Sequence, residues 1–125
     1  MSITRYQPAK RMSKIVVSGG IAYLAGQVAN ENLDADIKGQ TATVLSKIDA
    51  LLAQAGTDKS RILQAQIFLT NINDAAGMNE VWDAWVSPDG SPARATVQAA
   101  LNSPKYLIEI LVTAEVDGRL GQPAH

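Results

Sequence analysis

Two charged residues stand in stretches of the sequence that otherwise have the apolar pattern of strands. Arg94 begins the stretch from Arg94 to Ala100, and Glu109 lies between apolar neighbours in the stretch from Tyr106 to Val116. A carboxylate among apolar side chains must point to water or have a partner, because burying it alone costs several kcal/mol. We expect these two strands to be neighbours, which makes Arg94 the available partner.

Three interpretations of this pair are open. The residues form a structural ion pair, they are two solvent-facing charges on an edge strand, or they belong to a small-molecule site. In the third case the planar fork of the Arg94 guanidinium binds a carboxylate, and Glu109 orients or activates a water molecule. Spacing alone does not choose between these interpretations.

Other kinds of site have no support in the sequence. There is no GxxxxGK[ST] loop and no GxGxxG after a strand, so phosphate and dinucleotide binding are not expected. The acidic residues are scattered and His125 is the only imidazole, so we expect neither a metal site nor a cofactor. His125 is also the last residue, which argues against catalysis centred on histidine.

Length and composition limit the number of domains and the classes of function further. The chain has 125 residues and a net charge of −1, which fits one domain over residues 1–125. A net charge of −1 argues against the basic surface that nucleic-acid-binding proteins carry. There are no cysteines, so a thiolate nucleophile and an iron–sulfur cluster are excluded. No apolar run approaches the roughly 20 residues needed to span a bilayer, and the N-terminal residues lack the apolar core of a secretory signal. We therefore expect a cytoplasmic protein without membrane contact.

The hydrophobic pattern predicts the elements that must position these residues. Strands are expected at residues 15–17, 21–26, 62–69, 94–100 and 106–116, with a further short strand at Tyr6. The first two strands are joined by a turn at Gly19 and Gly20. One helix is expected over 37–55, capped by Asp34 or Asp36 and ended by Gly56. A second helix carries the stripe Met78, Val81, Trp82 and Trp85.

This order, β-β-α-β-α-β-β, predicts an α+β fold in which a mixed sheet carries both helices on one face. The last strand is apolar on both faces, since Leu107 and Leu111 alternate with Ile108 and Ile110. A chain of this size has no third layer, so we expect copies of the chain to cover the outer face in a closed cyclic oligomer. Trp82 and Trp85 are expected to be packing residues, Asn79 a structural cap or bridge, and the tail from Asp117 mobile.

Four segments, in order along the chain, resemble the RidA (YjgF-type) family of reactive enamine and imine deaminases. They are Ala25–Val28, Phe68–Asp74 leading into Met78–Trp82, Pro92–Gln98 and Ile108–Ile110. The resemblance implies a chorismate-mutase-like fold and a barrel-like homotrimer with clefts between subunits. It also implies cofactor-free hydrolysis of 2-imino or 2-enamino acids, such as 2-iminopropanoate, to 2-oxo acids and ammonia, as a form of metabolite damage control.

The same resemblance assigns roles to individual residues. Arg94 is similar to the family arginine that grips the substrate carboxylate, and Glu109 to the glutamate that positions the attacking water. Gly26 matches a glycine whose backbone borders the cleft, and Thr96 matches a further position that lines it. Positioning and carboxylate binding suit this reaction, because the carbon of an imine is already electrophilic.

The N-terminal part of the site departs from the family pattern. Ser13 matches, but Met12 stands where a tyrosine is usual, and Ala25 replaces the serine that commonly precedes the Gly-Gln pair. These differences resemble a divergent Rid subgroup that keeps the arginine. They also leave an alternative function open, namely a non-catalytic trimer that binds or senses a small carboxylate in the same cleft. A third hypothesis, an interaction or chaperone-like protein, depends only on an exposed apolar sheet surface.

Overall fold

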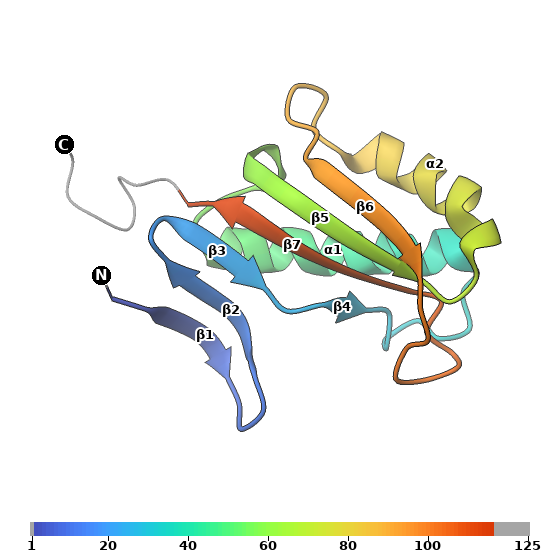
Figure 1. The fold of residues 1–125 in the computed structure, drawn as a ribbon, viewed down its shortest axis with the longest axis horizontal. Coiled ribbons are helices and arrows are strands. Elements are labelled where there is room, and N and C mark those ends of the chain that lie inside the picture. Colours follow the sequence, from blue (N-terminus) through green and yellow to red (C-terminus); the bar gives the residue numbers. More distant parts are fainter. Residues whose placement is uncertain (1, 117–125) are drawn as a thin grey trace.

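The computed structural model describes residues 2–116 (Figure 1). The predicted mobile tail and His125 lie outside this range. Within it, no helix has the length and apolar character needed to cross a membrane.

The elements follow the predicted order with one added strand before the first helix. The strands are β1 (Thr4–Pro8), β2 (Ser13–Ser18), β3 (Ile21–Leu24), β4 (Gln27–Val28), β5 (Ile62–Leu69), β6 (Ala93–Gln98) and β7 (Ile108–Glu115). The helices are α1 (Ile37–Gln54) and α2 (Ala75–Trp85), with short 3-10 turns at Lys59–Arg61 and Ile72–Asp74. The short strand expected at Tyr6 is β1, whereas β4 was not predicted.

Local signals explain where these elements begin and end. The Asp36 carboxylate accepts a hydrogen bond of 2.9 Å from the Gly39 amide and caps α1, as predicted. Gly56 follows α1 with φ of +83°, a conformation that glycine adopts without strain. Gly19 and Gly20 have φ of +62° and +80° and form the predicted tight turn between β2 and β3.

One mixed sheet holds the strands in the order β1-β2-β3-β7-β5-β6, and β4 also pairs with β7. Only β5 and β6 pair in parallel; the other pairs are antiparallel. The core lies between the sheet and the helices, and Figure 1 shows α1 running along one face of the sheet. The predicted α+β architecture is confirmed.

The expectation that the strands of Arg94 and Glu109 are neighbours is wrong, because β5 lies between β6 and β7. Helix α2 links β5 to β6 as a crossover, which places β6 in parallel beside β5 and at the edge of the sheet. Strand β7 lies between β3 and β5, and its alternate side chains, from Ile108 to Ala114, are buried in the core. Residues 99–107 form the connection between β6 and β7, which lie on either side of β5.

The outer face of the sheet keeps apolar groups at its surface. Tyr23 of β3 and Val97 of β6 are 48% and 47% exposed, and Phe68 and Leu111 between them are half-buried. This face lies opposite the helices, since Phe68 and Leu111 alternate along their strands with fully buried neighbours.

Candidate functional site

Arg94 lies on edge strand β6 and packs against helix α2. It is paired with Ala65, whose buried side chain faces the helices. The Arg94 side chain therefore also projects from the helix-covered face of the sheet. Its guanidinium carbon lies 5.3 Å from the ring centroid of Trp82, an arrangement that orients the plane of the guanidinium. Within residues 2–116 no carboxylate forms an ion pair with Arg94. The cation is thus oriented by an aromatic ring and open to an anionic ligand.

Two polar oxygens on the elements that carry Arg94 and Trp82 are buried without a hydrogen-bond partner within residues 2–116. They are the Thr96 hydroxyl, two residues beyond Arg94 on the same face of β6, and the Asn79 side-chain carbonyl on α2. Asn79 precedes Trp82 by one helical turn, which places it on the face of α2 that carries the stacked tryptophan. An unpartnered buried oxygen costs about 1–3 kcal/mol, so a partner outside the chain would be favourable here.

Glu109 lies at a different place, on central strand β7 against the backbone of Gly26. A Cβ atom added to Gly26 would overlap the Glu109 carboxylate oxygen Oε2 and lie 2.9 Å from its Cδ. With glycine at this position, the carboxylate approaches the backbone closely, and any larger residue would force the Glu109 side chain to move. Glu109 is also paired with Val28 of β4, which fixes the β7 backbone on this side.

The N-terminal residues singled out by the sequence adjoin the Gly26 end of the sheet. The Ala25 amide donates to the Lys14 carbonyl at 2.9 Å, so Ser13 at the start of β2 and Gly26 in the link between β3 and β4 are the next residues along the two segments. Met12 follows in the turn between β1 and β2 and is 56% exposed. The structure therefore groups Ser13, Gly26 and Glu109, with Met12 at the border of the group.

Arg94 and Glu109 do not meet in one chain, so the ion-pair interpretation is wrong. Arg94 is aligned through Ala65 with Val112, three residues along β7 from Glu109. This offset corresponds to about 10 Å along the strands, and two strand spacings add a similar distance across the sheet. Because three is an odd number of residues, the two side chains also leave opposite faces of the sheet. Each chain therefore carries two separate polar groups, one with Arg94 and one with Glu109.

The sequence predicts that Asn79 is a structural cap or bridge. In the structure the N-cap residue of α2 is Asp74, and the Asn79 side-chain oxygen has no hydrogen-bond partner within residues 2–116. The signal that identifies it is a polar side chain on the helix face that also buries Met78 and Trp82. Asn79 is the functional candidate that the sequence interpretation missed.

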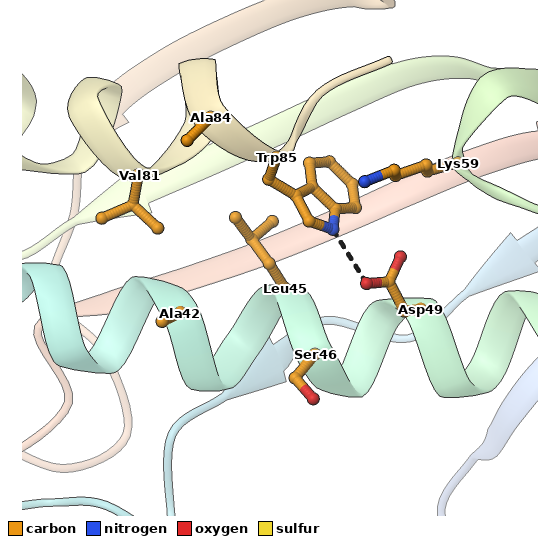
Figure 2. A pocket seen from close by; sticks show the side chains of 8 residues that line it. All are labelled: Ala42, Leu45, Ser46, Asp49, Lys59, Val81, Ala84 and Trp85. Atoms are coloured by element: carbon orange, nitrogen blue, oxygen red, sulfur yellow. Dashed lines mark hydrogen bonds between the residues drawn. The ribbon is translucent and has the colours of Figure 1, made fainter.

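A hollow of about 340 Å³ lies elsewhere, between α1 and α2 (Figure 2). Trp85 forms one wall; its indole Nε1 donates to Asp49 at 2.9 Å, and the Lys59 ammonium lies 5.3 Å from its ring centroid. The remaining lining is Ala42, Leu45, Ser46, Val81 and Ala84. None of the predicted site residues lines this hollow, and Trp85 serves to pack the helices together, as expected.

The described residues contain no group of three or more histidine, cysteine, aspartate or glutamate side chains placed to hold a metal ion.

Comparison with known proteins identifies the family. The family described as "Endoribonuclease L-PSP" matches residues 2–116. The RutC family protein YoaB of Escherichia coli is 47% identical over 116 residues, covering 93% of this chain and 100% of that protein. A RutC family protein of Haemophilus ducreyi is 44% identical over 115 residues, covering 92% of this chain and 97% of the relative.

Solved structures agree with these sequence matches. NMB1025 of Neisseria meningitidis, a member of the YjgF protein family, superposes with a TM-score of 0.89 at 40% identity, covering 94% of this chain and 97% of that one. The chain therefore belongs to the L-PSP endoribonuclease family, the YjgF/Rid family that its sequence motifs resembled.

Proposed function

We propose that this protein is a cofactor-free hydrolase that converts reactive 2-imino or 2-enamino acids to 2-oxo acids and ammonia. Its substrates carry a carboxylate next to the imine carbon, as 2-iminopropanoate does. The observation that carries the proposal is Arg94, which is stacked on Trp82 and has no carboxylate partner within residues 2–116. A guanidinium held in this way binds a carboxylate through two parallel hydrogen bonds.

The reaction needs little more than binding and a positioned water. Glu109 accepts a proton from a water molecule as the water oxygen forms a bond to the imine carbon, giving a carbinolamine. Glu109 returns this proton to the nitrogen, which completes the amino group of the carbinolamine. The hydroxyl proton is then transferred to the amino group in the same way, the carbon–nitrogen bond breaks with its electron pair on nitrogen, and ammonia leaves as the carbon–oxygen bond becomes the carbonyl of the 2-oxo acid. One water is consumed for each ammonia released, and no oxidant or reductant takes part.

The two polar groups act together only when two copies of the chain meet. Arg94 and Glu109 leave opposite faces of the sheet, so one small substrate does not span them within a chain. The exposed apolar side chains of the outer face, including Tyr23 and Val97, favour burial against further copies. We therefore propose a closed homotrimer in which Arg94 and Thr96 of one subunit face Gly26 and Glu109 of the next.

A non-catalytic carboxylate-binding trimer is the second candidate. The observation that favours it is the pair Met12 and Ala25, where the Rid pattern has a tyrosine and a serine. Such a protein binds 2-oxo acids saturably at Arg94 but does not accelerate loss of the imine.

The family name also refers to RNA cleavage. We do not propose that activity, because a net charge of −1 provides little of the phosphate attraction on which RNA binding depends.

A coupled assay tests the first proposal. A purified amino-acid oxidase or dehydratase generates the imine, and its loss is followed with and without this protein. We expect acceleration by the parent protein and little by Arg94→Ala. No acceleration over buffer, together with saturable binding of 2-oxobutanoate, would instead support the binding protein. Equal activity of Arg94→Ala and the parent contradicts the assigned role of Arg94.

A further inference from the structure

Two polar side chains of α1 point toward the sheet. Gln40 is fully buried, and the Lys47 side chain keeps only 25% of its surface exposed. They are seven residues apart, about two helical turns or 10 Å, so they share one face of the helix. Their hydrogen-bond partners lie on the two backbone segments that flank Glu109.

Lys47 holds the segment that begins with β4. Its ammonium donates to the Val28 carbonyl at 2.8 Å, to Asn30 Oδ1 at 2.7 Å and to Glu31 Oε1 at 3.0 Å. Val28 is the residue paired with Glu109. Strand β4 has two residues and pairs only with β7, so few backbone bonds of its own keep it in place.

Gln40 holds the segment that leads into β7. Its Nε2 donates to the Lys105 carbonyl at 2.9 Å and to the Leu33 carbonyl at 3.3 Å, and its Oε1 accepts from the Leu107 amide at 2.9 Å. Leu107 precedes Glu109 by two residues. The glutamine thus uses both ends of its amide to fix the chain just before the carboxylate.

The Glu109 carboxylate itself receives no side-chain or backbone hydrogen bond within residues 2–116. Its position is therefore set by the backbone of β7 and by the close approach of Gly26. We infer that Gln40 and Lys47, the α1 clamp, are positioning residues that hold Glu109 against Gly26 through the backbone of β4 and β7. The catalytic consequence rests on the proposed function; the effect on the backbone does not.

Lys47→Met tests the clamp, since it keeps most of the side-chain length and removes the three donors. Lys47→Arg keeps the charge and donors. Lys38→Met is the matched control, because Lys38 is a lysine of the same helix whose ion pair with Glu80 lies on the surface. Two readouts are compared: amide hydrogen exchange of residues 25–31 and 105–110, and turnover of 2-iminopropanoate alongside binding of 2-oxobutanoate.

We expect Lys47→Met to exchange faster at residues 25–31 and to lose about tenfold in kcat, with binding of 2-oxobutanoate changed by less than about threefold. Lys47→Arg recovers most of the kcat, and Lys38→Met matches the parent. Unchanged exchange at 25–31 overturns the inference. So does a parallel fall of kcat and binding in proportion to lost folded protein. If the parent does not turn over imines, the proposed function fails and the exchange data alone decide on the clamp.

Discussion

Arg94 and Glu109 lie on opposite faces of the sheet, with β5 between their strands. Each has its own surroundings: Arg94 stacks on Trp82 near the unpartnered Thr96 hydroxyl, and Glu109 lies against Gly26. Two incomplete polar groups on one chain are consistent with a site assembled between copies.

Replacing Arg94 tests carboxylate recognition. Arg94→Lys keeps the charge but loses the planar fork and the stack on Trp82. We expect KM for 2-iminopropanoate to rise about tenfold, and kcat/KM of Arg94→Ala to fall about a hundredfold. Steady-state kinetics in the coupled assay measure both. Arg61→Lys is the control, since Arg61 pairs with Glu115 outside the site. A fully active Arg94→Lys variant would show that the fork is not used.

Replacing Gly26 tests the position of Glu109. In Gly26→Ala the new Cβ overlaps the carboxylate, so the Glu109 side chain must move. We expect kcat to fall at least about tenfold, while the free energy of unfolding drops by less than about 2 kcal/mol because the side chain is flexible.

Gly20→Ala serves as the control for Gly26→Ala. It strains a residue with φ of +80° but meets no atom within 4 Å. Its free energy of unfolding should drop by about 1 kcal/mol with kcat unchanged. An active Gly26→Ala enzyme, measured beside this control, is incompatible with the assigned place of Glu109.

Restoring the family residues tests the departures at the N-terminal part of the site. Ala25→Ser and Met12→Tyr each add a hydroxyl near Gly26 and Ser13. We expect the double variant to gain about threefold or more in kcat/KM for 2-iminopropanoate, since a hydrogen bond contributes about 0.5–1.5 kcal/mol. A loss of activity in the double variant would indicate that Met12 and Ala25 are suited to a different substrate.

Much of the fold could be predicted because local signals and packing agree. The Asp36 cap, the Gly56 stop and the apolar stripe of α1 all specify the same helix. Strand β5 has the predicted bounds, Ile62 to Leu69. The two-residue strand β4 was missed because it is too short for any alternation to be visible.

The sequence could not predict which strands are neighbours. Arg94 and Glu109 were expected on adjacent strands because those strands follow each other along the chain, whereas the crossover through α2 places β6 outside β5. Asn79 was missed for a related reason. Its buried and unpartnered oxygen becomes visible only when α2 is packed against the sheet.

Low pH should weaken the contact between Lys47 and Glu31. The hydrogen bond from Lys47 holds the pKa of Glu31 below its usual range. The stability from this contact is present above the pKa of Glu31 in the unfolded chain and is lost as pH falls through the lower pKa of the folded state. We expect the parent to unfold at a higher temperature than Glu31→Gln near neutral pH, with the difference becoming smaller as the pH falls below the ordinary pKa of a glutamate, about 4.3. A constant difference across this range contradicts the assignment.

Mixing two inactive variants tests the central claim most directly. Arg94→Ala and Glu109→Gln are unfolded together in equal amounts, refolded and assayed for loss of 2-iminopropanoate. If each site takes Arg94 from one subunit and Glu109 from the next, random mixing regenerates about a quarter of the intact sites. We predict that the mixture recovers about that share of the parent activity while each variant refolded alone stays inactive. A mixture as inactive as its components, although it assembles like the parent, would contradict a site built from two chains.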